Sequence, residues 1–125
     1  MGGLVSYYYA SRLAGAYTVP QVITIASPLQ GTHMAKIGLG QCAREMEIGS
    51  ELLQELNESM KCCTDVRFYN IATKTDELVV PHSSSIFMSD PHRQFFIHDV
   101  GHASLLLSQR VTDQIGKWLQ EKSLI

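Results

Sequence analysis

A short run of β-branched residues constrains the fold of this chain more than any other feature. The segment Val22–Ala26 reads Val-Ile-Thr-Ile-Ala and is apolar on both of the faces that a strand presents. A strand with one face in water alternates apolar and polar residues, whereas a strand inside a parallel sheet is apolar throughout. The run therefore predicts a strand buried in a parallel sheet.

Helical and strand-like segments alternate along the rest of the chain. Two more strands are expected at Val66–Ala72 and Gln94–His98, and helices at about Leu4–Ala16, after Ser50 and near the C-terminus. Ser50 is a natural N-cap, and Gly38–Gln41 is expected to be irregular. The helix positions expected to share a face are Leu4, Tyr8, Ser11 and Gly15, then Leu52, Leu53, Leu56 and Met60, then Leu107, Val111, Ile115, Trp118 and Leu119.

This alternation predicts an α/β fold with about three parallel strands and flanking helices. Three strands are few for such a sheet, and one apolar edge would lack a neighbour. A bare edge such as Val22–Ala26 invites pairing with another chain. The sheet is therefore expected to be incomplete, with possible association through its exposed edge.

Composition narrows the class of protein. The 125 residues are 45% hydrophobic and 18% charged, with a formal net charge of -2. That balance is typical of one globular domain or part of one, taken here as a partial domain over 1–125, and gives no electrostatic basis for binding nucleic acid. The longest stretch without Asp, Glu, Lys or Arg, Leu13–Ala35, is interrupted by glycine and proline, so no transmembrane segment is expected.

The three cysteines give no clear pattern. Cys42, Cys62 and Cys63 are odd in number and two are adjacent. One disulfide from Cys42 to either Cys62 or Cys63 is possible, but free thiols without a function are favoured. The adjacent cysteines and the absence of a Cys-x-x-Cys pair make a metal site a weak signal, so neither metal nor cofactor is expected.

Two titratable residues follow the second and third expected strands. Asp76 lies in the loop after Val66–Ala72, and His102 in the loop after Gln94–His98. In open α/β sheets reactive groups gather beyond the carboxyl ends of the strands. An acid followed by a histidine also fits the order of a serine-hydrolase triad, in which the serine comes first.

Five stretches in order, covering nearly the whole chain, resemble the C-terminal part of bacterial α/β-hydrolase-fold lipases and esterases, the triacylglycerol-lipase-like group. That family usually reads Thr-Pro-His-x-Gly-Thr where this chain has Ser27-Pro28-Leu29-Gln30-Gly31-Thr32. The departure at Leu29 is expected to alter the rim of the site without removing a triad member. The five stretches are Met1–Tyr8, Val22–Thr32, Gly49-Ser50 with Leu53 and Leu56-Asn57, Asp76–Pro81, and Val100–His102 with Leu105-Leu106.

The resemblance implies a role for each matching residue. Met1-Gly2-Gly3 would be the second half of a Gly-x-Ser-x-Gly turn, with the nucleophilic serine just before Met1. Asp76 would be the triad acid, His102 the general base, and the backbone N–H of Met1 one donor of the oxyanion hole. The implied reaction is hydrolysis of carboxylic esters or lipids through an acyl-enzyme.

No serine of the chain is expected to replace that nucleophile. Ser6 would lie roughly 9 Å along the helix from the nucleophile position, and Ser27 and Ser104 have no elbow pattern. The other histidines, His33, His82, His92 and His98, are expected at the surface or in support of the site, with His82 a candidate pocket residue. The chain alone is therefore predicted to lack serine-hydrolase turnover.

A second interpretation stays open. The chain could be a non-catalytic interaction module that keeps the hydrolase scaffold and binds through its sheet edge. If the first interpretation holds, the start could be a misassigned internal Met, a disrupted gene or a processed fragment. Substrate chain length, head group, oligomeric state and cellular location are not readable from these residues.

Overall fold

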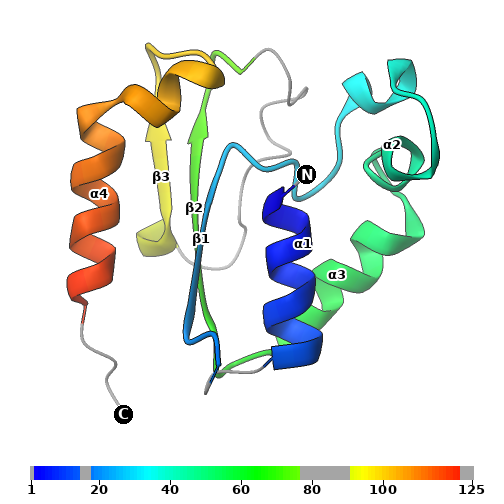
Figure 1. Ribbon diagram of the computed structural model, residues 1–125, viewed down its shortest axis with the longest axis horizontal. Coiled ribbons are helices and arrows are strands. Elements are labelled where there is room, and N and C mark those ends of the chain that lie inside the picture. Colours follow the sequence, from blue (N-terminus) through cyan, green and yellow to red (C-terminus); the bar gives the residue numbers. More distant parts are fainter. Residues whose placement is uncertain (1, 15–17, 77–90, 122–125) are drawn as a thin grey trace.

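The chain folds into three layers, a parallel sheet between two layers of helices (Figure 1). The computed structural model describes residues 2–14, 18–76 and 91–121. Helices α1 and α3 cover one face of the sheet and α4 covers the other (Figure 1). The strands are β1 (Gln21–Ile25), β2 (Arg67–Thr73) and β3 (Gln94–Ile97), and the helices named here are α1 (Gly2–Tyr8), α3 (Glu51–Cys62) and α4 (Gln109–Gln120).

The sheet is parallel throughout, with strand order β1-β2-β3. Ile25 pairs with Ile71, and Ile71 with Phe95, so the carboxyl ends of all three strands lie at one edge of the layer. The predicted α/β class with three parallel strands is confirmed. The strand boundaries differ from expectation by one residue, except the start of β3 at Gln94, which is as predicted. Within the described residues β1 pairs only with β2, so its other edge has no strand beside it.

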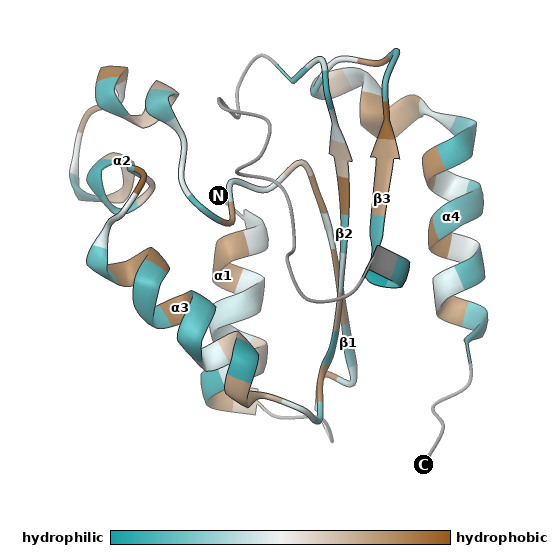
Figure 2. Cartoon of the chain, turned by 180° about the vertical axis from the view of Figure 1, so that it is seen from behind, coloured by the Kyte–Doolittle hydropathy of each residue, from teal (hydrophilic) through white to brown (hydrophobic). Residues whose placement is uncertain are grey.

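Two apolar clusters hold the layers together. The first, between the sheet and α1 and α3, includes Tyr7, whose ring centroid lies 4.7 Å from that of Phe68. The second, between the sheet and α4, centres on Trp118, 1% exposed, with its ring centroid 4.8 Å from that of Tyr69. Burying an aromatic side chain of this size contributes about 2–3 kcal/mol. Figure 2 shows apolar positions of the helices turned toward the strands.

The first helix presents a different face from the one expected. Its buried residues are Leu4, Tyr7 and Ala10, while Tyr8 is 38% exposed. Tyr7 turns inward because its hydroxyl reaches the Tyr69 carbonyl and the Thr24 hydroxyl, both at 3.4 Å. Beyond Tyr8 the helix widens into a π-helix, Tyr9–Ala14, where the Ser11 hydroxyl donates to the Tyr7 carbonyl at 2.7 Å. Such back-bonding competes with the regular helical ladder.

Ser50 caps α3 as predicted. Its hydroxyl accepts a hydrogen bond from the Leu53 N–H at 3.4 Å. The same region holds two elements that the sequence did not indicate, the 3-10 helix η2 (His33–Ile37) and the short helix α2 (Gln41–Glu45). The expectation of irregular structure is therefore wrong at Gln41, where α2 begins directly after Gly40, a residue with φ of 94°.

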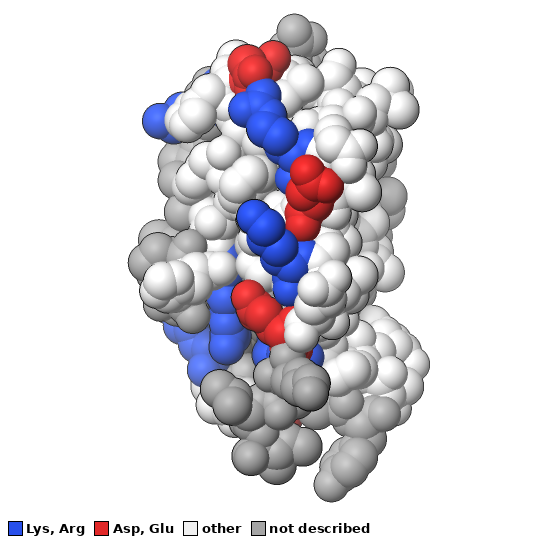
Figure 3. Space-filling model, turned by 90° about the vertical axis from the view of Figure 1, so that its left-hand side faces the viewer, with Lys and Arg blue, Asp and Glu red and all other residues white. Residues whose placement is uncertain are grey.

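The terminal helix begins later than its apolar pattern suggested. Val111 and Trp118 are buried as expected, but Leu107 is 90% and Leu119 65% exposed. Leu107 belongs to a separate 3-10 helix, η5 (Ala103–Leu107), which buries Leu105 instead. Acidic and basic side chains alternate along the α4 side of the molecule (Figure 3), so no single sign of charge dominates that view.

No helix among the described residues combines the length and the apolar character needed to cross a membrane.

Candidate active site

Asp76 and His102 meet at the carboxyl edge of the sheet. Asp76 lies three residues beyond β2, and His102 is the N-cap residue of η5 after β3. Their side chains are hydrogen-bonded, with 2.8 Å between Asp76 Oδ2 and His102 Nδ1. The Asp76 side chain is 1% exposed and that of His102 31%. The acid is therefore enclosed by protein, while the imidazole keeps a path to solvent.

The contact places His102 Nδ1 against the Asp76 carboxylate. An ionised carboxylate only accepts hydrogen bonds, so Nδ1 must carry the proton in the Asp76 contact. In neutral imidazole the other nitrogen, Nε2, then has a free lone pair. A histidine held in this tautomer by a buried carboxylate is suited to accept a proton at Nε2.

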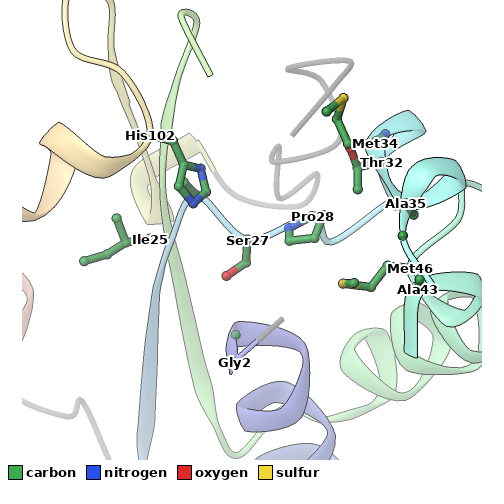
Figure 4. Close-up of a pocket in the computed structure, with 13 residues that line it drawn as sticks. Gly2, Ile25, Ser27, Pro28, Thr32, Met34, Ala35, Ala43, Met46 and His102 are labelled. Atoms are coloured by element: carbon green, nitrogen blue, oxygen red, sulfur yellow. The ribbon is translucent and has the colours of Figure 1, made fainter. Parts of the chain in front are cut away.

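A pocket of about 480 Å³ lies beside His102. Its walls come from the start of α1, from the end of β1 with the loop after it, and from η2 and α2 (Figure 4). In Figure 4 the His102 ring, the Ser27 side chain and the Gly2 end of α1 face the same space. The residues from η2, α2 and the turn after it are mostly apolar, among them Met34, Ala35, Ala43 and Met46.

Gly3 brings α1 into contact with the end of β1. A Cβ at this position would lie 1.9 Å from Ser27 Oγ and 2.7 Å from Ser27 Cβ, closer than any normal contact. At Gly2, by contrast, a Cβ would meet nothing within 4 Å. A glycine at position 3 is therefore what allows the start of α1 to form one wall of the pocket.

The loop after β1 is held in an unusual conformation. Ala26 has a φ of 49°, a left-handed value that costs a non-glycine residue about 1–2 kcal/mol. The Asn57 side chain donates to the Leu29 carbonyl at 3.3 Å. Leu29 itself is 2% exposed and packs in the α1 and α3 core. Leu29 therefore does not line the pocket, and the effect on the rim of this departure from the family pattern stays a prediction.

The serines of the described residues are not hydrogen-bonded to the base. Ser27 lines the pocket with His102, which the sequence did not indicate, yet the only hydrogen bond His102 makes through its ring within the described residues is the one to Asp76. Ser6 donates to the Gly2 carbonyl at 3.0 Å instead. Met1, expected as an oxyanion donor, and His82 lie outside the described residues.

The other candidate residues do not line this pocket. His33, His92 and His98 are exposed, and all three cysteines are free thiols. Across the described part of the chain no three His, Cys, Asp or Glu side chains gather as metal ligands would.

A second carboxylate lies on the same loop as His102. Asp99 is hydrogen-bonded through both oxygens to Nη2 of Arg110, with 2.6 Å to Oδ1. The hydrogen bond from Arg110 holds the pKa of Asp99 below its usual value. Elsewhere burial raises the pKa of Tyr7 to about 12; burial, then the hydrogen bond to Glu121, raises that of Tyr69. Neither tyrosine lines the pocket.

Comparisons with known proteins identify no family for this chain. The chain matches no protein-family model and no curated protein sequence. Any function assigned to it therefore rests on the arrangement of its own residues and on the sequence resemblance described above.

Proposed function

We propose that Asp76 and His102 are the acid and the base of a serine hydrolase that acts on carboxylic esters or lipids. The observation that carries this proposal is the 2.8 Å contact between the buried Asp76 carboxylate and His102 Nδ1, with His102 lining a pocket. The nucleophile would be a serine directly before Met1, as the resemblance of the first residues implies.

In this proposal each group has one task. His102 Nε2 takes the proton of the serine hydroxyl as the oxygen attacks the ester carbonyl carbon, and Asp76 stabilises the imidazolium that forms. His102 then returns the proton to the leaving alcohol, which leaves an acyl-enzyme. Water, deprotonated by His102, cleaves the acyl-enzyme and releases the carboxylic acid and the free serine.

The pocket supports an apolar acyl group as substrate. Met34, Ala35, Ala43 and Met46 line the wall away from His102, and these side chains offer no charge to bind. A volume of about 480 Å³ lies within the range of small-molecule sites. Esters of medium-length fatty acids therefore fit the proposal better than charged or sugar esters.

Ester turnover tests the proposal. The chain alone should not hydrolyse p-nitrophenyl butyrate above the buffer rate, whereas a protein that also carries the residues encoded directly before Met1 should do so. His102→Ala and Asp76→Ala should each abolish that turnover. Activity in the chain alone that His102→Ala removes would contradict the predicted need for an outside nucleophile, and Ser27→Ala would then show whether Ser27 supplies it.

The outer edge of β1 favours a second candidate, a binding module without catalysis. The even-numbered positions bond to β2, as in the Ala26 N–H to Ile71 carbonyl bond of 2.7 Å and the Arg67 N–H to Pro20 carbonyl bond of 3.0 Å. Because bonding direction alternates along a strand, the backbone of Ile23 and Ile25 is directed to the edge where no described strand lies. Ile23→Pro would block strand addition there, so it should abolish capture of a partner if this candidate is correct.

A further inference from the structure

The loops that carry Asp76 and His102 lie just beyond the end of the sheet ladder. The last backbone hydrogen bond between them runs from the Lys74 N–H to the Ile97 carbonyl, 3.1 Å. Among the described residues no backbone hydrogen bond joins 75–76 to 98–102. Backbone pairing therefore stops before the acid and the base, and their separation must be set by other contacts.

Beyond that point two threonine hydroxyls join the two loops. Thr73 Oγ1 donates to the Val100 carbonyl at 2.6 Å, and Thr75 Oγ1 donates to the same oxygen at 2.9 Å. A carbonyl oxygen has two lone pairs and can accept both. The Thr75 N–H also donates to Thr73 Oγ1 at 3.3 Å, which fixes the spacing of the two hydroxyls. We call Thr73, Thr75 and the Val100 carbonyl the threonine clamp.

The clamp lies between the two reactive residues. Thr75 directly precedes Asp76, and Val100 is two residues before His102 with only Gly101 between them. The Gly101 carbonyl accepts a hydrogen bond from the Leu105 N–H at 3.2 Å, so η5 holds the chain on the His102 side. The clamp holds it on the Val100 side. The Asp99 to Arg110 pair also holds this loop, but both of its side chains are more than half exposed and solvent weakens it. Thr73, at 1% exposure, is shielded.

We propose that Thr73 and Thr75 are positioning residues that hold His102 Nδ1 against the Asp76 carboxylate. The inference rests on the proposed function for its chemical meaning, because a general base must present an unprotonated Nε2 to the nucleophile. Without the clamp the acid and the base would still be present, but their hydrogen bond would open more often. Thr73 and Thr75 touch neither substrate nor nucleophile in this role; they act through the two loops.

NMR of the imidazole nitrogens of His102 measures this hydrogen bond directly in the 125-residue chain. In a 15N-histidine-labelled chain, long-range proton–nitrogen spectra distinguish the tautomer with Nδ1–H from the tautomer with Nε2–H, and His102→Gln assigns the signals. The wild type should show Nδ1–H, exchanging slowly with water. In Thr75→Val and in the Thr73→Val/Thr75→Val double variant, that proton should exchange roughly tenfold faster, the equivalent of one lost hydrogen bond.

Controls separate positioning from general stability. Thr73→Ser and Thr75→Ser keep the hydroxyls and should retain the wild-type signal. Thr112→Val removes a hydroxyl on α4 that donates to the carbonyl of Ser108, the N-cap residue of that helix, at 3.4 Å. It does not contact the two loops, so it should leave His102 unchanged. Thr75 is exposed, and Thr75→Val should therefore fold even if the double variant does not.

Two results would overturn the inference. One is a folded Thr75→Val chain with the wild-type His102 tautomer and exchange rate, whatever its melting temperature. The other is a wild-type chain without the Nδ1–H signal, because the clamp would then hold no such hydrogen bond. Failure of the proposed function is a separate result: it would appear as absent ester turnover in the extended protein while the His102 signals still respond to the threonines.

Discussion

Two acid–base pairs each have one member on the loop after β3, and they differ in burial and in the kind of base. Asp76 and His102 are joined at 2.8 Å, and Asp99 and Arg110 by a two-oxygen contact. The Asp76 side chain is 1% exposed, whereas those of Asp99 and Arg110 are 63% and 59% exposed. The first pair lines a pocket through His102; the second faces solvent.

The difference shows that a short distance does not by itself mark a reactive pair. Arginine stays protonated at any pH a protein tolerates, so Arg110 cannot serve as a base, whereas histidine exchanges its proton near neutral pH. Solvent screens the exposed pair, so that pair contributes little to stability. Burial of the acid and a titratable partner together make Asp76–His102 the candidate for chemistry.

The largest expected difference between the two pairs is in turnover. In a protein that carries the proposed serine, His102→Ala should lower kcat for p-nitrophenyl butyrate by about four orders of magnitude, since the base and its tautomer are lost together. Arg110→Gln, which breaks the exposed pair, should leave kcat nearly unchanged. Comparable losses of kcat in the two variants would show that the exposed pair matters for turnover as much as the buried pair does.

The next largest effect is on stability and concerns the start of α1, which lines the pocket together with His102. Gly3→Ala places a Cβ 2.7 Å from Ser27 Cβ, which must push α1 from β1 and should destabilise the chain by about 1–3 kcal/mol. Gly2→Ala is the matched control, because nothing described lies within 4 Å of its Cβ. Urea unfolding midpoints give both values. Equal stability of the two variants would contradict the close packing at Gly3.

Removing the carboxylate of each pair in turn shows how much each pair contributes to the free energy of unfolding. Asp76→Ala removes a carboxylate that is 1% exposed, leaves His102 Nδ1 without its acceptor, and should cost about 1–3 kcal/mol. Asp99→Ala removes only exposed contacts and should change the urea midpoint far less. A larger loss at Asp99 than at Asp76 would show that the exposed pair holds the loop.

The smallest effect is the pH dependence of the exposed pair. The folded pKa of Asp99 is lowered by Arg110, so its contribution is present above the unfolded pKa of an aspartate and is lost as pH falls through the folded pKa. Asp99→Asn should therefore narrow slightly the stability gap between pH 6 and pH 3. In 1 M NaCl, where the Debye length is about 3 Å, wild type and Asp99→Asn should respond alike. Persistence of the difference in high salt would argue against a screened surface pair.

Local sequence patterns predicted the elements better than the site. The β-branched run at Val22–Ala26 and the cap at Ser50 act over a few residues, and the structure has a strand and a helix there. The prediction of which face of α1 is buried was wrong. Tyr7 points inward because its hydroxyl contacts Thr24 and Tyr69, which lie 17 and 62 residues further along the chain. Short elements such as α2 lack the periodicity that would reveal them.

The candidate site shows the same limit. The order of Asp76 and His102 after two strands was enough to suggest a pair, and its catalytic role stays a prediction. The threonine clamp could not be foreseen, because Thr73 and Thr75 bond to a backbone oxygen 25 to 27 residues away that no sequence pattern marks. The pocket position of Ser27 likewise depends on how closely Gly3 lets α1 approach.

The nucleotide sequence directly upstream of the Met1 codon tests the central claim most directly. The claim that Asp76 and His102 serve a serine nucleophile predicts codons for Gly-x-Ser in frame and immediately before Met1, preceded by strand-like segments. Gly-x-Ser codons out of frame, or behind a stop codon, would point to a disrupted gene whose product is inactive. No such codons in any frame would contradict the claim, and binding through the β1 edge would become the better account.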